Sequence, residues 1–199
     1  MIESERLRQQ IHFLREIDNL KQVLRQTVLI KDNRQENDAE HSWHLAMLSM
    51  ILSEYSNDSS IDLLRTLKMV LIHDLVEIDA GDTFCYDEQG REGKVERERE
   101  AAHRIFSILP NEMTQEYIDL WEEFESMETS EAQFAASMDR LQPIMLNFYS
   151  EGYAWKKHGI KKSQVIERNH HIAKGSKILW EFAENLIDEA VSRGYLIDA

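Results

Sequence analysis

The fold and the chemistry of this chain are decided within one stretch, residues 61–82, which reads IDLLRTLKMVLIHDLVEIDAGD. Apolar residues recur at three- and four-residue spacing through its first part and predict a helix over residues 61–75. That period stops at His73-Asp74, and three glycines are scattered over residues 78–93. We therefore expect residues 78–93 to form a surface loop. A loop directly after a His-Asp pair is expected to form the rim of a functional site.

Helical periodicity recurs on both sides of this stretch. It predicts further helices over residues 5–27, 39–55, 94–109, 112–126, 131–149 and 163–193. The chain has only 7 Gly and 2 Pro, which favours long helices over a turn-rich β fold, and no pair of strands is predicted. A chain of 199 residues suits one compact domain. The expected fold is all-α, a single-domain bundle of about seven helices over residues 1–199, with helix 163–193 packed on the rest.

Composition and charge narrow the classes of partner. The formal net charge is −14, which argues against binding a nucleic acid polymer through a basic surface. No apolar run approaches the roughly 20 residues that a membrane helix needs, so no membrane partner is expected. The N-terminal residues lack the apolar stretch of a secretory signal. A single cysteine, Cys85, cannot form an internal disulfide, and together these features predict a cytoplasmic location.

Four side chains are candidate ligands of one divalent metal ion: His41, His73, Asp74 and Asp139. Mixed imidazole and carboxylate ligands suit Zn, Mn, Fe or Co, with Mg not distinguishable from these by sequence. Neighbouring residues on a helix point about 100° apart, so a His-Asp pair shares one ion best at a helix end. Three predicted helices would then converge on one ion, as in other helical bundles that hold metals.

Two further carboxylates follow the His-Asp pair. Glu77 comes three residues after Asp74 and could take a proton from water, or hold that water for attack. Asp82 could ligate water or substrate, or fix Glu77 in place. In the alternative interpretation both belong to a solvated acidic loop.

Several cations could neutralise a substrate phosphate. Arg25 and Lys31 precede His41, Arg140 follows Asp139, and Lys94 borders the predicted loop.

Three alternative interpretations stay open for the candidate metal ligands. His41 and His44, at i and i+3, could form a metal pair of their own. His73 could serve only the dipole of its helix, and Asp139 could pair with Arg140 or another cation.

The order of three motifs resembles a known family. They are AEHSWHLA at 39–46, IHDLVEIDAGD at 72–82 and ASMDRLQP at 136–143. In this order they resemble the HD superfamily of metal-dependent phosphohydrolases, and within it the branch that contains the 5′-deoxynucleotidases. The similarity runs from about residue 20 to residue 149.

The resemblance implies a role for each candidate residue. It implies that His41, His73, Asp74 and Asp139 hold the metal, that Glu77 positions or deprotonates the attacking water, and that Asp82 lies near the substrate. It also implies an arginine on the substrate phosphate, for which Arg25 is the candidate, followed by an aromatic residue that crowds the sugar. Gln26 stands at that second position.

The expected function is metal-dependent hydrolysis of a phosphate monoester, a nucleoside or deoxynucleoside 5′-monophosphate. The alternatives are a phosphodiesterase or sugar-phosphate phosphatase of the same superfamily, or a non-catalytic helical module that binds nucleotides. The expected partner is a small phosphorylated substrate. The resemblance also implies a homo-oligomer, a dimer, with the first or the last helix as the candidate interface.

Overall fold

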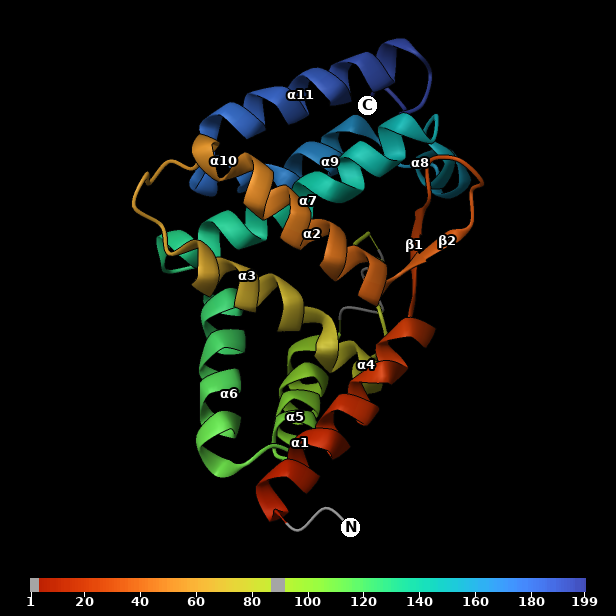
Figure 1. The fold of residues 1–199 in the computed structure, drawn as a ribbon. Helices are drawn as coiled ribbons and strands as arrows, with labels where there is room; N and C mark the ends of the chain where they lie inside the picture. The colour runs from red at the N-terminus through yellow and green to blue at the C-terminus, as the bar shows by residue number, and fades with distance from the viewer. Residues whose placement is uncertain (1–3, 87–91) are drawn as a thin grey trace.

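The computed structural model describes residues 4–86 and 92–199. Helices dominate it, as Figure 1 shows. In chain order the elements are α1 (Glu5–Glu16), η1 (Ile17–Gln22), β1 (Leu24–Val28), β2 (Gln35–Asn37), α2 (Asp38–Leu52), η2 (Ser53–Tyr55), α3 (Leu63–Ile72), η3 (His73–Val76), α4 (Glu77–Ala80), α5 (Lys94–Phe106), α6 (Asn111–Ser126), α7 (Ser130–Tyr149), α8 (Tyr153–His158), α9 (Lys162–Asn169), α10 (Ile172–Gly175) and α11 (Lys177–Ser192). Among the described residues, none of the helices is both long and apolar enough to cross a bilayer.

Helix α7 forms the centre of the bundle. It packs against α2, α3, α10 and α11, with α2 and α3 in front of it in the view of Figure 1 and α11 above it. Its side chains Phe134, Met138 and Leu141 are fully buried. The buried hydrophobic cluster is continuous from Phe13 on α1 to Leu196 near the C-terminus. The all-α fold class is confirmed, while the assignment of residues 1–199 to one domain stays a prediction.

The predicted helix over residues 5–27 is wrong in its last part. α1 ends at Glu16, the next turn tightens into η1, and Leu24–Val28 form a strand that pairs antiparallel with β2, Leu24 opposite Asn37. The expectation of no strand pair is therefore also wrong. Leu24 continues the three- and four-residue spacing of the apolar residues before it, and this spacing led to the prediction of a helix. The extended backbone is instead stabilised by pairing with β2 and by side-chain contacts from β1 to Glu36.

The predicted helix over residues 163–193 is divided into α9, α10 and α11. The break has a packing cause, because Gly175 lies so close to α7 that a Cβ added there would be 2.3 Å from Ser137 Oγ. Ser176 is extended, and its side chain accepts a hydrogen bond from the N–H of Leu179 as the N-cap of α11. Such divisions explain why the described chain has more and shorter helices than the seven expected.

The predicted loop over residues 78–93 lies partly outside the described residues, which omit 87–91. The prediction of a loop is wrong for residues 78–80, which belong to the short helix α4, and Gly81 follows that helix with φ +74°. A side chain is strained in this left-handed conformation, so glycine is the residue that can turn the chain here. The chain thus leaves the helical conformation at Gly81, directly before Asp82.

Candidate metal centre

The four candidate ligands come from the ends or the middle of three helices. His41 lies in the first turn of α2, which is fixed by a capping box. There, Asn37 Oδ1 accepts a hydrogen bond from the N–H of Glu40, and the Glu40 carboxylate accepts one from the N–H of Asn37. His73 is the C-cap of α3, and Asp74 follows it in the tighter turn of η3. Asp139 lies in the middle of α7.

The structure brings these four side chains together in the interior. His41 Nε2 lies 3.1 Å from Asp139 Oδ1 and 3.7 Å from Asp74 Oδ2. His73 Nε2 lies 3.0 Å from Asp74 Oδ1 and 3.7 Å from Asp139 Oδ1. All four are buried, His41 completely. Two imidazole nitrogens and two carboxylates therefore converge on one point, as the helix-end argument from the sequence predicts.

Hydrogen bonds on the far side of each imidazole fix its orientation. His41 Nδ1–H donates to Gln142 Oε1 at 3.1 Å, and His73 Nδ1–H donates to the carbonyl of Val70 at 3.0 Å. Gln142 in turn donates through Nε2 to Glu36 Oε1 at 2.6 Å. When Nδ1 alone carries a proton, as metal binding requires, each Nε2 presents its lone pair to the centre. Such outer hydrogen bonds select the tautomer that binds a metal.

The donor set fits a divalent cation. His73 Nε2 is buried and has no hydrogen-bond partner, although a carboxylate oxygen of Asp74 lies within 3.0 Å. A buried polar atom without a partner is costly, and a cation held between the imidazole and carboxylate groups would remove that cost. Ligand atoms of His41, His73 and Asp139 lie within 4.8 Å of one another, close enough to share one ion.

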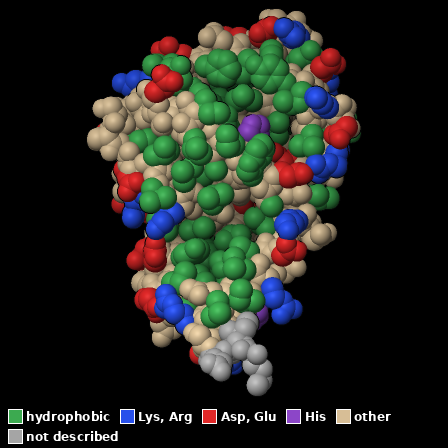
Figure 2. Space-filling view, viewed as in Figure 1, with side chains coloured by type: hydrophobic (Ala, Val, Ile, Leu, Met, Phe, Trp, Pro, Cys, Tyr) green, Lys and Arg blue, Asp and Glu red, His purple; other side chains and the backbone are tan. Residues whose placement is uncertain are grey.

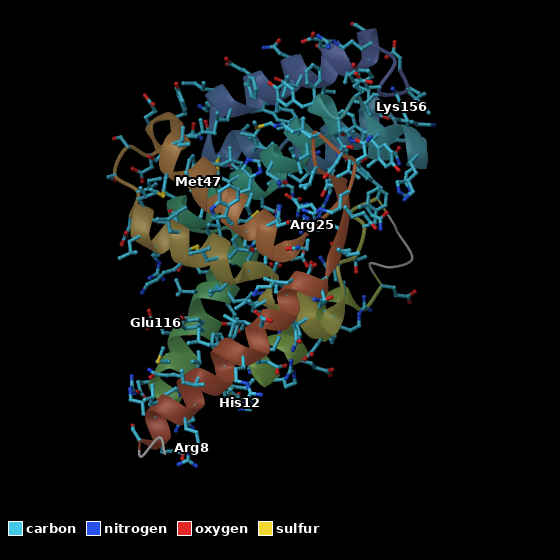
Figure 3. The ribbon with its side chains drawn as sticks, turned by 45° about the vertical axis from the view of Figure 1, so that its right-hand side comes forward. Arg8, His12, Arg25, Met47, Glu116 and Lys156 are labelled. Carbon is cyan, nitrogen blue, oxygen red and sulfur yellow. The ribbon has the colours of Figure 1, made fainter. Side chains whose placement is uncertain are left out.

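A second group of acidic side chains adjoins this centre. Ligand atoms of Asp38, Asp74 and Glu77 also lie within 4.8 Å of one another. Arg25 lies among them, with Nη1 3.0 Å from Asp38 Oδ1 and 2.9 Å from Asp74 Oδ2. Figure 3 shows Arg25 extending from β1 toward the start of α2. Because Asp74 belongs to both groups, it joins the arginine to the metal centre.

Burial and charge shift the pKa values of these carboxyls in opposite directions. Burial and the charge of Asp74 raise the pKa of Asp38 to about 7, against the opposing effect of Arg25. Burial and the charges of Asp74 and Asp82 raise the pKa of Glu77 well above its usual value. Burial also acts against ionisation of Asp74, but the charge of its neighbour His73 outweighs it and lowers the Asp74 pKa. The group therefore holds one strongly acidic carboxyl, Asp74, beside two that take up a proton readily, Asp38 and Glu77.

Asp82 and Lys94 lie at the edge of the acidic group. Burial raises the pKa of Asp82, and the charges of Arg25 and Lys94 act in the opposite direction. Lys94 Nζ lies 3.0 Å from Glu98 Oε1, and the charges of Glu98 and Glu77 raise the pKa of Lys94 against burial. Asp82 and Lys94 therefore lie near the site, and in the sequence one precedes and the other follows residues 87–91.

The other candidate cations differ in position. Lys31 is exposed in the turn between β1 and β2. Arg140 Nε lies 3.4 Å from Asp139 Oδ2, so the ion pair considered as the alternative for Asp139 does form beside the centre. His44 does not join the clusters that could hold a metal among the described residues, and its Nδ1 instead accepts from Gln142 Nε2 at 3.2 Å.

Gln26 lies on the opposite face of β1 from Arg25. Arg25 and Thr27 both contact Glu36, and alternation along a strand turns the residue between them to the other side. Gln26 lines a cavity of about 580 Å³ together with Phe84 and Tyr86. The position at which the resemblance implies an aromatic residue therefore opens onto this cavity.

Sequence reasoning missed three buried residues of the site: Glu36, Asp38 and Gln142. Gln142 comes three residues after Asp139 on α7, so its helical spacing could have shown that it shares a face with a ligand. Asp38 begins α2 within the sequence N-D-A-E, a recognisable capping-box pattern. Glu36 carries no comparable signal, because β2 was not predicted.

Comparison with known proteins agrees with this geometry. The HD domain family matches residues 17–180. A crystal structure from Magnetospirillum magnetotacticum, of a predicted metal-dependent phosphohydrolase, is 49% identical with a TM-score of 0.94, covering 99% of this chain and 98% of that one. The human 5′-deoxynucleotidase HDDC2 is 30% identical over 136 residues, which cover 68% of this chain and 65% of the human protein. The zebrafish protein of that name is 27% identical and covers 84% and 92% of the two chains. The chain belongs to the HD domain family.

Proposed function

We propose that this protein is a metal-dependent phosphohydrolase that cleaves a phosphate monoester, a nucleoside or deoxynucleoside 5′-monophosphate. One observation carries the proposal: a buried centre of two histidines and two aspartates adjoins, through the shared Asp74, an arginine and the buried carboxyl of Glu77. The names of the human, zebrafish and Magnetospirillum relatives support the same reaction class. The single free cysteine, Cys85, fits a cytoplasmic location.

In this proposal His41, His73, Asp74 and Asp139 hold one divalent ion, of Mn, Co, Zn, Fe or Mg. When bound, such an ion supplies Lewis-acid activation of water and neutralises negative charge on the phosphate. Support comes from the unpartnered Nε2 of His73 and from the hydrogen bonds that fix both imidazoles through Nδ1.

Glu77 is the proposed proton acceptor. Its carboxyl is buried, and its Oε2 has no hydrogen-bond partner. A base works best when its pKa lies near the working pH, and the raised pKa of Glu77 moves it in that direction. The water oxygen forms a bond to phosphorus as its proton passes to Glu77. The bond between phosphorus and the ester oxygen breaks, and that oxygen leaves as the alcohol after taking up the proton that Glu77 accepted from the water.

Arg25 is the proposed phosphate ligand. Its ion pairs with Asp38 and Asp74 hold the guanidinium beside the centre, so little side-chain freedom remains to be lost when substrate binds. Its charge would stabilise the equatorial oxygens during in-line attack. Asp82 and Lys94 border the same space and are proposed to contact the substrate or its water.

The first experiment measures phosphate release from ribo- and deoxynucleoside 5′-monophosphates with added Mn²⁺, Co²⁺, Zn²⁺ or Mg²⁺. We expect metal-dependent release, and Glu77→Gln is expected to lower kcat by about 10²- to 10⁴-fold while metal content is retained. Asp79→Asn is the matched control, because Asp79 is two residues away and pairs at the surface with Arg104. Because Gln26 replaces the aromatic residue, both sugars belong in the panel.

Two outcomes would contradict the proposal. Absence of phosphate release from every monoester, with bound metal demonstrated, would shift the assignment to a phosphodiester, a sugar phosphate or a non-catalytic nucleotide-binding module. Equal loss of kcat in Glu77→Gln and Asp79→Asn would remove the specific role given to Glu77.

A further inference from the structure

The cavity of about 580 Å³ that Gln26 lines is not used by the proposed reaction. Its volume falls within the range of about 300–1,000 Å³ that is typical of small-molecule sites. Helix α8 packs against β1 beside it. The described residues that line it are Gln26, Phe84, Tyr86, His158, Gly159, Ile160, Lys161 and Gln164. We call this space the β1–α8 cavity.

Aromatic rings form part of the wall of this cavity. The ring centroids of Phe84 and His158 lie 4.6 Å apart, and those of Phe84 and Tyr86 lie 5.3 Å apart. The bases of nucleotides stack on aromatic side chains, since every base has a π face. The side-chain amides of Gln26 and Gln164 add hydrogen-bond donors for the edge of a base. The wall therefore suits a nucleobase.

Lysines are concentrated beside the same cavity. Residues 156–162 read KKHGIKK, in a chain whose net charge is −14. Lys161 lines the cavity, and Lys157 lies four positions before it. Both are exposed, and neither forms an ion pair with another described residue, whereas Lys162 pairs with an aspartate at 2.8 Å. Figure 3 labels Lys156 on α8, beyond Arg25 on β1.

The cavity differs in charge from other surfaces of this acidic chain. None of the described residues that line it is an aspartate or a glutamate. By contrast, a cavity of about 420 Å³ between α3 and α6 is lined by Asp62, Glu112, Glu116 and Asp119. On the face over α2, α3 and α1, Figure 2 shows hydrophobic side chains along the middle and charged side chains of both signs toward the edges. An anionic group is therefore expected to bind at the β1–α8 cavity rather than at these surfaces.

We propose that the β1–α8 cavity binds a nucleotide, separately from the substrate at the metal centre. The base would stack against Phe84 and His158, and the phosphates would lie at Lys157 and Lys161. A nucleotide accounts for both features, because a sugar phosphate has no ring to stack and an uncharged ring system has no group for the lysines. The site does not depend on the proposed reaction, since none of its lining residues holds the metal or the scissile phosphate there.

Two segments separate this cavity from the metal centre. On β1, Gln26 lines the cavity, while the preceding residue, Arg25, pairs with a metal ligand. In the second segment Phe84 and Tyr86 line the cavity, while Cys85 between them interacts electrostatically with Arg25. A nucleotide in the cavity would therefore contact the reverse side of segments that border the metal centre, without occupying that centre.

The test is calorimetric titration of the full chain with ATP saturated with Mg²⁺. A triphosphate is the probe because the proposed reaction takes a monophosphate and because several phosphate oxygens can meet both lysines. We expect one ATP to bind per chain, and adenosine or inorganic triphosphate alone to bind at least about tenfold more weakly.

Two substitutions address the two halves of the site. Phe84→Ala is expected to weaken ATP binding by about fivefold to 100-fold, as loss of a stacking ring does. Lys161→Glu is expected to weaken it by about tenfold or more, because a carboxylate would stand where the phosphates bind. Circular dichroism checks the fold, and Lys161 is exposed, so its variant is informative even where Phe84→Ala does not fold.

Matched controls come from α11, outside the cavity. Phe182→Ala removes a ring that is 38% exposed, and Lys177→Glu reverses the charge of an exposed lysine. Neither should change ATP binding. Arg25→Gln, which weakens the proposed phosphate site at the metal centre, should also retain ATP binding.

Three results would overturn the proposal. The first is no binding of ATP up to about 1 mM. The second is equal weakening in the cavity variants and in their controls on α11. The third is loss of binding in folded Arg25→Gln with retention in folded Phe84→Ala and Lys161→Glu, which would assign the nucleotide to the metal centre.

Discussion

Arg25 on β1 and Asp74 in η3 are separated by 49 positions in the sequence, yet Arg25 Nη1 lies 2.9 Å from Asp74 Oδ2. The other oxygen of the same carboxylate lies 3.0 Å from His73 Nε2. One aspartate therefore links the arginine proposed to bind phosphate with the histidine proposed to bind metal. The position of each group depends on the other, so changes at one are expected to affect both binding and stability.

Replacement of Arg25 tests this linkage. Arg25→Gln removes the cation shared by Asp38 and Asp74, and breaking a buried ion pair costs about 3–5 kcal/mol. We expect unfolding free energy to fall by about 3 kcal/mol, since the Arg25 side chain is 13% exposed. We also expect KM for a nucleoside monophosphate to rise at least tenfold. Urea unfolding and steady-state kinetics measure the two effects.

Arg34→Gln is the control for this change. Arg34 also pairs with a carboxylate, Glu40, but its side chain is 50% exposed, so its loss should alter stability little. If Arg25→Gln changes neither KM nor stability more than Arg34→Gln does, Arg25 has no special role.

Metal binding should release about one proton from His73. Burial acts against protonation of its imidazole, but the negative charges of Asp74 and Asp139 outweigh burial and raise the pKa of His73 to about 10 in the metal-free protein. At pH 7 to 8 the ring is therefore protonated, and a metal ion must displace that proton. Apparent metal affinity should rise with pH up to about 10.

Calorimetric titration of metal in two buffers with different ionisation enthalpies measures this proton release. The metal-free protein should also lose the stability contributed by His73 as pH rises, because its folded pKa lies above the unfolded value of about 6.5. That contribution is complete below pH 6.5 and declines toward about pH 10. Metal binding without net proton release at pH 7 would contradict the prediction.

Gln142 should control metal affinity without touching the metal. Its Oε1 accepts the Nδ1–H of His41, and its Nε2 donates to Glu36. Gln142→Leu keeps a similar size but leaves His41 Nδ1 without an acceptor, so the ring orientation is no longer fixed. Loss of such an outer hydrogen bond costs about 10- to 100-fold in metal affinity.

Competition with a chelator measures that affinity. Gln133→Leu is the control on the same helix, because Gln133 donates to the carbonyl of Met127 rather than to a ligand. Unchanged affinity in folded Gln142→Leu protein would remove its proposed role.

Close packing of α10 on α7 should make Gly175 intolerant of a side chain. A Cβ there would lie 2.3 Å from Ser137 Oγ and 2.4 Å from the carbonyl oxygen of Gln133. Overpacking of this kind costs about 1–3 kcal/mol. We expect Gly175→Ala to lower unfolding free energy by that amount in urea titrations. Lys174→Ala, at an exposed neighbouring position, should be near neutral, and a fully stable Gly175→Ala variant would contradict the close approach.

The sequence by itself was sufficient to predict most of the helices and to select the candidate metal ligands along the chain. Helical period is a local property, so the helices around residues 39–52, 94–106, 111–126 and 130–149 could be predicted from spacing alone. The end of α3 near His73-Asp74 could also be predicted, because the apolar periodicity stops there. His41, His73, Asp74 and Asp139 could be selected because imidazole and carboxylate groups at these positions make a recognisable donor set.

Only the tertiary structure decided what surrounds those residues. Residues 24–28 have a helical apolar spacing, but their pairing with β2 and the contacts of Arg25 with Asp38 and Asp74 stabilise an extended strand. Long-range contacts of this kind have no local signal, so Glu36 could not be assigned to the site from the sequence. The spacing of Asp38 and Gln142 could place them near a ligand but could not show which residues they contact. The same limit applies to the surface, because spacing shows that a helix has an apolar stripe but not whether the fold covers it. On α1, α2 and α3 the fold leaves the outer stripes exposed, since their inner sides already fill the core.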